Sequence, residues 1–145
     1  MKTFPVPFSL GENLTINSNN PTQPSKEEII NKAYLFQSKG NISEAAKYYQ
    51  NFINQGFKDH RVFSNYGIIL QGRGNLKEAE ISFCKAIELK PDFAEAHYNL
   101  GNILKDLGNL QDLGNLQEAE ICTRKAIKLN PDFAEAYSNL GVILK

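Results

Sequence analysis

After about residue 25, apolar residues recur at helical spacing, and short polar clusters interrupt them at regular intervals. The pattern predicts seven helices, over residues 27–39, 43–55, 60–72, 76–89, 94–107, 116–129 and 134–145. Gly-Asn pairs precede three of them, at Gly40-Asn41, Gly74-Asn75 and Gly114-Asn115. Glycine suits a turn with positive φ, and asparagine caps the helix that follows. No strand is predicted, so the expected fold class is all-α.

The chain also repeats itself. The segment LKEAEISFCKAIELKPDFAEAHYNLGNILK, residues 76–105, returns almost letter for letter as LQEAEICTRKAIKLNPDFAEAYSNLGVILK in residues 116–145. A helix pair of this length cannot bury its own apolar face, so such pairs stack on one another and share a core. This architecture is typical of interaction scaffolds rather than of enzymes.

Small and large residues hold fixed places within each repeat. In repeat 60–93 these places are Gly67, Ala79, Phe83, Ala86 and Pro91. The arrangement resembles the tetratricopeptide repeat family, whose units are helix-turn-helix pairs of about 34 residues. The resemblance implies a right-handed α-solenoid over residues 25–145, with repeats at 26–59, 60–93 and 94–133 and a half repeat at 134–145.

The segment before the array has a different composition. Residues 1–24 are rich in Asn, Pro, Ser and Thr, and their prolines prevent a long helix. We expect a flexible leader that does not contribute to stability. The alternative is that the aromatic-proline cluster Phe4-Pro5-Val6-Pro7-Phe8 is a short docking motif.

The third repeat carries a tandem duplication. LGNLQD, residues 107–112, is followed directly by LGNLQE, residues 113–118, at the place where the two helices of the repeat should turn. Insertions are tolerated there, because the stacking surfaces lie elsewhere. We expect the turn at Gly114-Asn115, with the preceding helix continuing toward Leu113. A protruding loop is the alternative.

Composition excludes several function classes. Sixteen basic residues balance 16 acidic ones, whereas nucleic-acid binding through phosphates requires a basic face. No apolar run approaches the roughly 20 residues that span a bilayer, and residues 1–15 do not resemble a signal peptide, so a cytoplasmic location is expected.

No residues suggest catalysis or a bound cofactor. Cys84 and Cys122 have no neighbouring Cys or His at zinc-binding spacing, so we expect two free thiols packed as small apolar groups. The histidines, His60 and His97, occupy separate places in the repeat plan, and no catalytic constellation includes them. We therefore expect a protein that is not an enzyme and holds no metal.

A row of polar residues is the candidate binding site. In tetratricopeptide arrays the first helix of each repeat lines a concave face, and its sixth position is Asn in all four repeats here. The candidate peptide-binding residues are Asn31, Asn65, Asn99, Asn102, Asn139, Arg61 and Tyr98. An asparagine amide both donates and accepts hydrogen bonds, so such a row would hold an extended peptide by its backbone.

This row resembles the asparagine ladder of O-GlcNAc transferase-like proteins. We expect it to lie in a solvated groove, where substitution costs affinity and not stability. The alternatives are that the amides bond within the array, or that the asparagines are inherited by repeat duplication without a role in binding. A second use of the family's groove, the clamp for a C-terminal carboxylate, is rejected, because the places that need basic residues hold Ile30, Glu95 and Asn99.

The expected function is a protein-interaction scaffold that binds an extended peptide of a protein partner, without nucleic acid or membrane. One alternative is the N-terminal substrate-recruiting array of a longer, glycosyltransferase-like protein. The other is a self-assembling repeat module. The half repeat suggests this self-assembly. Residues 134–145 have no second helix to cover their apolar face, so we expect them to associate with another copy or to fray.

Overall fold

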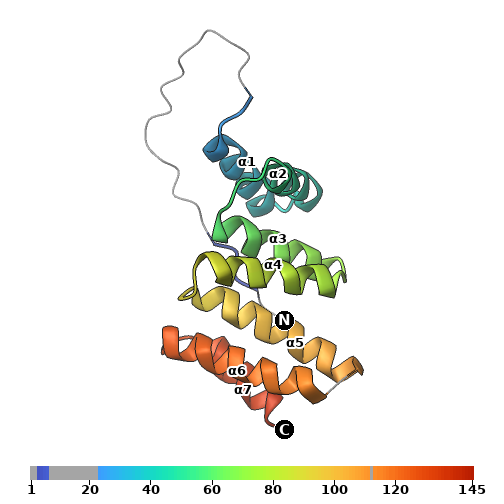
Figure 1. Cartoon of the computed structure of the whole chain (residues 1–145), viewed down its shortest axis with the longest axis vertical. Coiled ribbons are helices and arrows are strands. Elements are labelled where there is room, and N and C mark those ends of the chain that lie inside the picture. The colour runs from blue at the N-terminus through green and yellow to red at the C-terminus, as the bar shows by residue number, and fades with distance from the viewer. Residues whose placement is uncertain (1–2, 7–22, 112) are drawn as a thin grey trace. The chain divides into compact units, whose positions relative to one another are not determined.

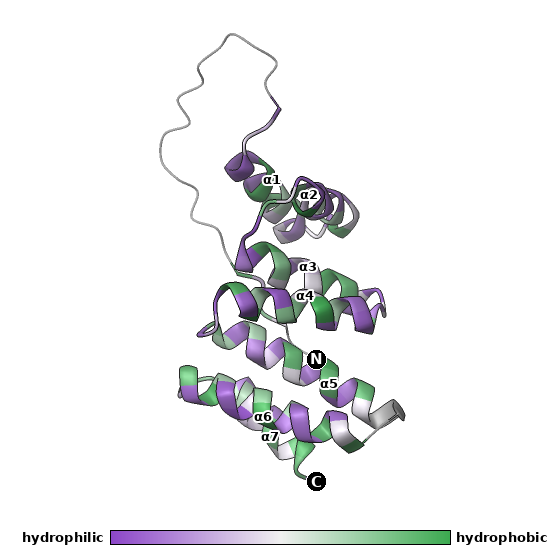
Figure 2. Ribbon diagram, viewed as in Figure 1, coloured by the Kyte–Doolittle hydropathy of each residue, from purple (hydrophilic) through white to green (hydrophobic). Residues whose placement is uncertain are grey.

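The computed structural model describes residues 3–6, 23–111 and 113–145 (Figure 1). The described residues form seven helices and no strand, which confirms the all-α solenoid. The helices are α1 (Lys26–Ser38), α2 (Ile42–Asn54), α3 (His60–Gly72), α4 (Leu76–Leu89), α5 (Ala94–Gln111), α6 (Leu113–Leu129) and α7 (Ala134–Ile143). Hydrophobic and hydrophilic residues are interspersed along the helices (Figure 2).

The chain divides into two compact units. The small unit, Val6–Lys58, contains α1 and α2, and the large unit comprises Asp59–Lys145 together with Met1–Pro5. In the small unit α1 begins with a capping box: the Glu28 N–H donates to Ser25 Oγ (3.2 Å) and the Ser25 N–H donates to Glu28 Oε2 (3.1 Å). Its core contains the fully buried side chains of Ile29, Tyr49 and Phe52.

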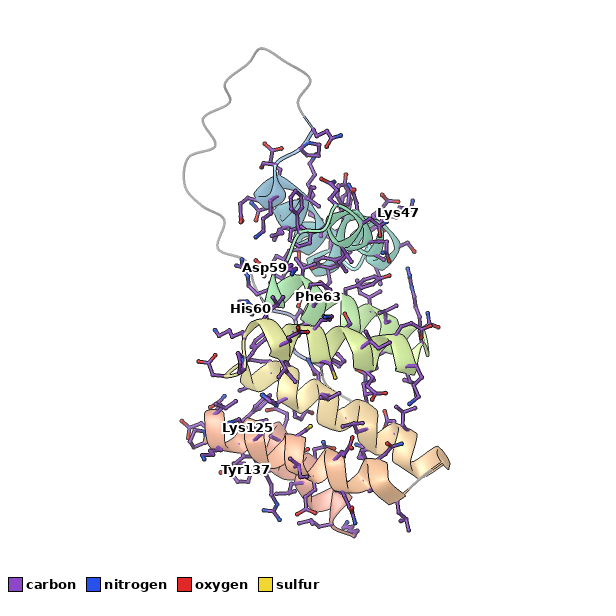
Figure 3. All side chains as sticks on the ribbon, viewed as in Figure 1. Lys47, Asp59, His60, Phe63, Lys125 and Tyr137 are labelled. Atoms are coloured by element: carbon purple, nitrogen blue, oxygen red, sulfur yellow. The ribbon has the colours of Figure 1, made fainter. Side chains whose placement is uncertain are left out.

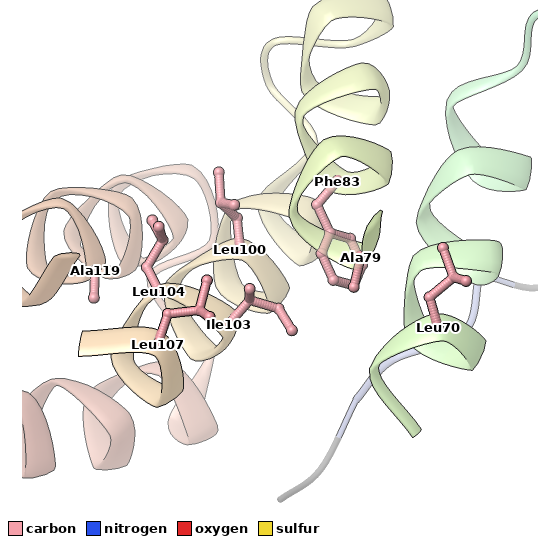
Figure 4. Close-up of a cluster of buried hydrophobic side chains, with 8 residues drawn as sticks. All are labelled: Leu70, Ala79, Phe83, Leu100, Ile103, Leu104, Leu107 and Ala119. Carbon is pink, nitrogen blue, oxygen red and sulfur yellow. The ribbon is translucent and has the colours of Figure 1, made fainter. Parts of the chain in front are cut away.

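The core of the large unit runs continuously through the helix pairs α3/α4 and α5/α6. One cluster of buried side chains joins residues of α3, α4, α5 and α6 (Figure 4). Its members are Leu70, Ala79, Phe83, Leu100, Ile103, Leu104, Leu107 and Ala119. Because α4 packs on α5 as well as on α3, each pair relies on its neighbour to cover its apolar face.

Glycine allows the helices of each pair to approach closely. A Cβ on Gly67 of α3 would lie 2.8 Å from Cε1 of Phe83, a fully buried ring of α4. At the equivalent place in α5, a Cβ on Gly101 would lie 2.6 Å from Thr123 Oγ1 of α6. Gly141 holds the same place in α7, but no atom lies within 4 Å of its added Cβ. The close approach therefore exists only where the second helix is present.

The turn signals were only partly correct. Gly40 and Gly74 have positive φ of 77° and 78°, as predicted, and Asn41 Oδ1 accepts from the Glu44 N–H (3.4 Å). Asn75, however, makes no side-chain capping bond. A capping pattern in the sequence thus predicts where a helix begins more reliably than it predicts whether a side chain makes the capping hydrogen bond.

The duplication lengthens both helices of its pair. The prediction that α5 continues beyond the repeat's usual end is correct, since it reaches Gln111. The predicted turn at Gly114-Asn115 is wrong, because α6 already begins at Leu113. The added turns pack on each other: a Cβ on Gly108 would lie 2.9 Å from Leu116 Cγ. This glycine contact continues the close pairing of α5 and α6, and it favours two longer helices over a protruding loop.

Alanine at these glycines tests the close approach. We expect Gly67→Ala and Gly101→Ala to destabilise the chain by about 1–3 kcal/mol, because the added methyl overpacks a buried contact. The matched change Gly141→Ala adds the same methyl in open space and should stabilise α7 by up to about 1 kcal/mol through helix propensity. Urea unfolding measures all three, and equal effects of Gly67→Ala and Gly141→Ala would contradict the packing.

Helix α7, the last helix that the structure describes, has part of its apolar surface exposed. Tyr137 and Val142 are 51% and 55% exposed, and Leu144, just beyond the helix, is 56% exposed (Figure 3). Ala136 and Asn139 on the opposite side are buried. The helix therefore contacts the preceding pair through one face.

This uncovered face predicts association between copies of the chain or, in a monomer, fraying of α7. Sedimentation equilibrium on the chain and on Leu140→Glu, with amide exchange of residues 134–145, distinguishes the two. Leu140→Glu should abolish any concentration dependence. A strict monomer whose last helix is as protected from exchange as α3 would contradict the prediction.

Candidate peptide-binding face

Three first helices of the large unit present the candidate site. Tyr98, Asn99 and Asn102 lie on α5, Asn65 lies on α3 and Asn139 lies on α7. Because α5 packs on both α3 and α7, these residues share one side of the unit, which we call the inner face. Asn31, the remaining member of the predicted row, belongs to α1 of the small unit and is half-buried.

The inner face is not the solvated groove that the sequence suggested. Asn65, Asn99 and Asn102 are completely buried, and Asn139 is 6% exposed. First helices contact one another in this unit, α3 with α5 and α5 with α7, so neighbouring helices cover part of this face. The expectation of a solvated groove is therefore wrong for these four asparagines, while the effect of substituting them on stability stays a prediction.

Several of these amides lack hydrogen-bond partners. Both side-chain atoms of Asn99 and of Asn102 are buried and make no hydrogen bond to the described residues. Asn139 is half-satisfied: Lys105 Nζ donates to its Oδ1 (2.8 Å), while its Nδ2 has no partner there. A buried polar group without a partner costs about 1–3 kcal/mol. The alternative that the amides bond to one another does not hold for Asn99 and Asn102.

Arg61, another predicted site residue, forms an ion pair at the start of α3. Its Nη2 and Nε donate to Asp59 Oδ2 and Oδ1 (2.8 and 3.1 Å), and its backbone N–H donates to Oδ1 as well (2.9 Å). Burial alone would raise the pKa of Asp59, but these bonds and the Arg61 charge outweigh it and lower the pKa. Asp59 is the N-cap of α3 (Figure 3), and its ion pair gives Arg61 a structural role at the start of this helix.

An aromatic cluster adjoins the asparagines. Tyr98 and Phe133, with ring centroids 4.8 Å apart, are 3% and 5% exposed, and Ala126 and Ala136 are buried against them. Phe4 from the N-terminal segment packs on this cluster. Of the expected flexible leader, the structure describes residues 3–6 and 23–24, and at Phe4 the segment contacts the array.

The two cysteines lie beside an outer cleft between α4 and α6. Cys84 and Cys122 line it together with Leu100, Leu104 and Ile121. Both thiols are free, as predicted, but Cys84 is exposed, so the expectation that it packs as a small apolar group is wrong. Burial, with the other thiol and Glu118 as smaller causes, raises the pKa of Cys122 to about 11. The thiol is therefore protonated at neutral pH and behaves as a small apolar group.

The described residues offer no metal site and no membrane helix. Within them, no three His, Cys, Asp or Glu side chains are grouped so that they could hold a metal ion. Nor does any helix in this part of the chain have the length and apolarity that crossing a membrane requires. The polar groups that stand out are the amides of the inner face.

Sequence reasoning missed three residues of this face: Lys105, Phe133 and Phe4. Lys105 holds the twelfth place of its repeat, a place that faces the groove in this type of array, so its position could have identified it. Phe133 belongs to the repeated Pro-Asp-Phe and was attributed to the junction between repeats. Phe4 belongs to the aromatic-proline cluster that the sequence offers as an alternative docking motif, but that cluster does not indicate that Phe4 contacts residues more than 90 positions away.

Comparisons with known proteins agree with the geometry. Residues 62–108 match the model of a family described as TPR repeat, and residues 110–133 match one described as tetratricopeptide repeat. No curated protein matches the chain in sequence.

Solved structures share the fold. A mutant of the O-GlcNAc transferase of Thermobaculum terrenum is 24% identical over 82% of this chain and 22% of that chain, with a TM-score of 0.71. MamA is 19% identical over 82% of this chain and 66% of its own, with a TM-score of 0.73. This chain thus spans less than two thirds of either.

The second TPR domain of human RPAP3, in complex with the HSP70 peptide SGPTIEEVD, is similar in size to this chain. It is 22% identical over 81% of this chain and 92% of its own, with a TM-score of 0.68. At these identities the likeness concerns the fold alone.

Proposed function

Since the chain belongs to the tetratricopeptide repeat family, we propose that it is a protein-interaction scaffold whose inner face binds an extended peptide segment of a partner protein. The asparagines of α3, α5 and α7 hold the backbone of that segment. Tyr98 and Lys105 contribute side-chain contacts. The chain itself carries out no chemical step.

The observation that carries this proposal is the pair Asn99 and Asn102. They lie three residues apart, hence on the same side of α5, and neither amide has a hydrogen-bond partner among the described residues. A peptide group offers one donor and one acceptor, and a primary amide matches both. A peptide backbone on the inner face would satisfy groups that the fold alone leaves unsatisfied.

The charge of the face limits which peptides suit it. The RPAP3 domain is recorded with a peptide that ends in Glu-Glu-Val-Asp. In this chain the corresponding basic places hold Ile30, Glu95 and Asn99, and Glu95 would repel a terminal carboxylate. The single lysine that binds Asn139 does not reverse this. We therefore propose recognition of an internal, uncharged stretch rather than an acidic C-terminus.

A second candidate keeps the same site within a larger protein. The transferase match covers 22% of that chain, which is consistent with a repeat array that serves as one part of a longer polypeptide. In that setting the inner face would recruit a substrate protein to a catalytic domain that lies outside these 145 residues.

Alanine substitution of the buried amides tests the proposal. Peptides selected on the full chain from a random phage-displayed library are the probe, and calorimetry gives their affinity. Asn99→Ala and Asn102→Ala should each weaken binding about 5- to 30-fold, as expected for about 1–2 kcal/mol of hydrogen bonding. The free chain should lose little stability to them, because each change also removes an unsatisfied buried group.

Asn75→Ala is the matched control, since Asn75 is exposed and makes no capping bond. It should leave the affinity unchanged. Failure to select any peptide, or full retention of affinity in the Asn99→Ala/Asn102→Ala double variant, would refute peptide binding at the inner face.

A further inference from the structure

The N-terminal segment reaches the inner face through one aromatic side chain. The Phe4 ring lies 5.1 Å from that of Phe133 and 5.8 Å from that of Tyr98, with interplanar angles of 82° and 71°. Both are edge-to-face contacts, the arrangement that aromatic quadrupoles favour. Because residues 1–5 belong to the large unit, the contact lies within a single compact body.

The cluster that receives Phe4 is peculiar to one repeat. We call it the aromatic subsite; it consists of Tyr98, Phe133, Ala126 and Ala136. At the place of Tyr98, the other repeats in the large unit have serine, Ser64 and Ser138. The equivalent of Phe133 is Phe93, whose ring packs edge-on against His60 (5.0 Å). Among the described residues of the inner face, only those around α5 place two aromatic rings where a third ring packs against both.

The segment that carries Phe4 has the form of a bound peptide. Residues 3–6 adopt neither helix nor strand, Pro5 is exposed, and Thr3 borders a cavity that Ile68 and Asp106 also line. Proline fixes its own φ and biases the preceding residue toward an extended backbone. A Phe-Pro pair therefore loses little conformational freedom when its ring enters the subsite.

We propose that the aromatic subsite binds the phenylalanine of an extended Phe-Pro peptide, and that Phe4 is its resident occupant. This inference rests on the proposed function, because it assigns the side-chain specificity of the same face. A partner peptide of this type must displace the chain's own segment. Since occupant and subsite share one chain, the competing effective concentration is on the order of millimolar.

Removing the occupant tests the proposal. The probe is the octapeptide MKTFPVPF, residues 1–8 of the chain with a fluorescent label at its C-terminus, and anisotropy gives its affinity for full-length variants. Phe4→Ala should bind it at least tenfold more tightly than the unsubstituted chain does. The peptide MKTAPVPF should not bind. Ile81→Ala, which trims an exposed apolar side chain of α4, should show no gain.

A second change locates the gain. Adding Tyr98→Ser to Phe4→Ala should abolish the gain in affinity for the octapeptide. Serine is chosen because the neighbouring repeats carry it at this place. Circular dichroism confirms that the helices persist. Equal affinity of the octapeptide for the unsubstituted and Phe4→Ala chains would overturn the proposal, as would a gain that survives Tyr98→Ser in a folded variant.

A library-selected peptide, measured on the same variants, separates this inference from the proposed function. If that peptide binds in an Asn99-dependent way while the octapeptide shows no gain with Phe4→Ala, the aromatic subsite is refuted and the scaffold function stands. If neither peptide binds any variant, both fail. A gain for both peptides in Phe4→Ala supports the inference and shows that the N-terminal segment competes with partners.

Discussion

The close approach of the two helices within each pair is the contact on which the large unit depends. Gly67 lies against the Phe83 ring, and Gly101 lies against Thr123. At each glycine, the neighbouring helix occupies the space that a side chain would otherwise fill. This brings α4 close to α3 and α6 close to α5, so that one core runs through both pairs. The duplicated segment keeps this close approach, because Gly108 and Leu116 continue the contact along the lengthened helices. Where no second helix exists, at Gly141, the apolar surface remains exposed.

The same stacking creates the unusual polarity of the inner face. First helices that contact one another enclose whatever residue lies between them, and in this chain that residue is asparagine. A leucine would pack there without an unsatisfied group, so the amides cost the free protein stability. Such a cost is intelligible if the groups meet a peptide backbone. Glu95, which would repel a terminal carboxylate, and the aromatic subsite beside Asn99 favour an extended apolar segment over an acidic tail.

The fold was predictable because its determinants are local and repeated. The capping box at Ser25, the glycines at the turns and the regular spacing of Ala79 and Phe83 each indicate the same helix pairs.

The candidate site was predictable only as a row of positions. Whether Asn99 is solvated or buried depends on how closely α3 and α7 flank α5, which no local pattern encodes. The Phe4 contact joins distant segments through ring packing alone, and composition suggested a flexible leader instead. The turn of the duplication was misplaced because both of its Gly-Asn pairs, which the sequence offers as turn signals, lie inside the lengthened helices α5 and α6.

The central claim is that the buried amides of the inner face are completed by a bound peptide backbone. The most direct measurement is a ¹⁵N-edited NMR spectrum of the side-chain amides, recorded as a library-selected peptide is titrated into the full chain. The signals of Asn99 and Asn102 should move downfield as their N–H groups gain acceptors, and their exchange with solvent should slow, while those of Asn75 stay in place. Saturating peptide that leaves the Asn99 and Asn102 signals unchanged would contradict the account.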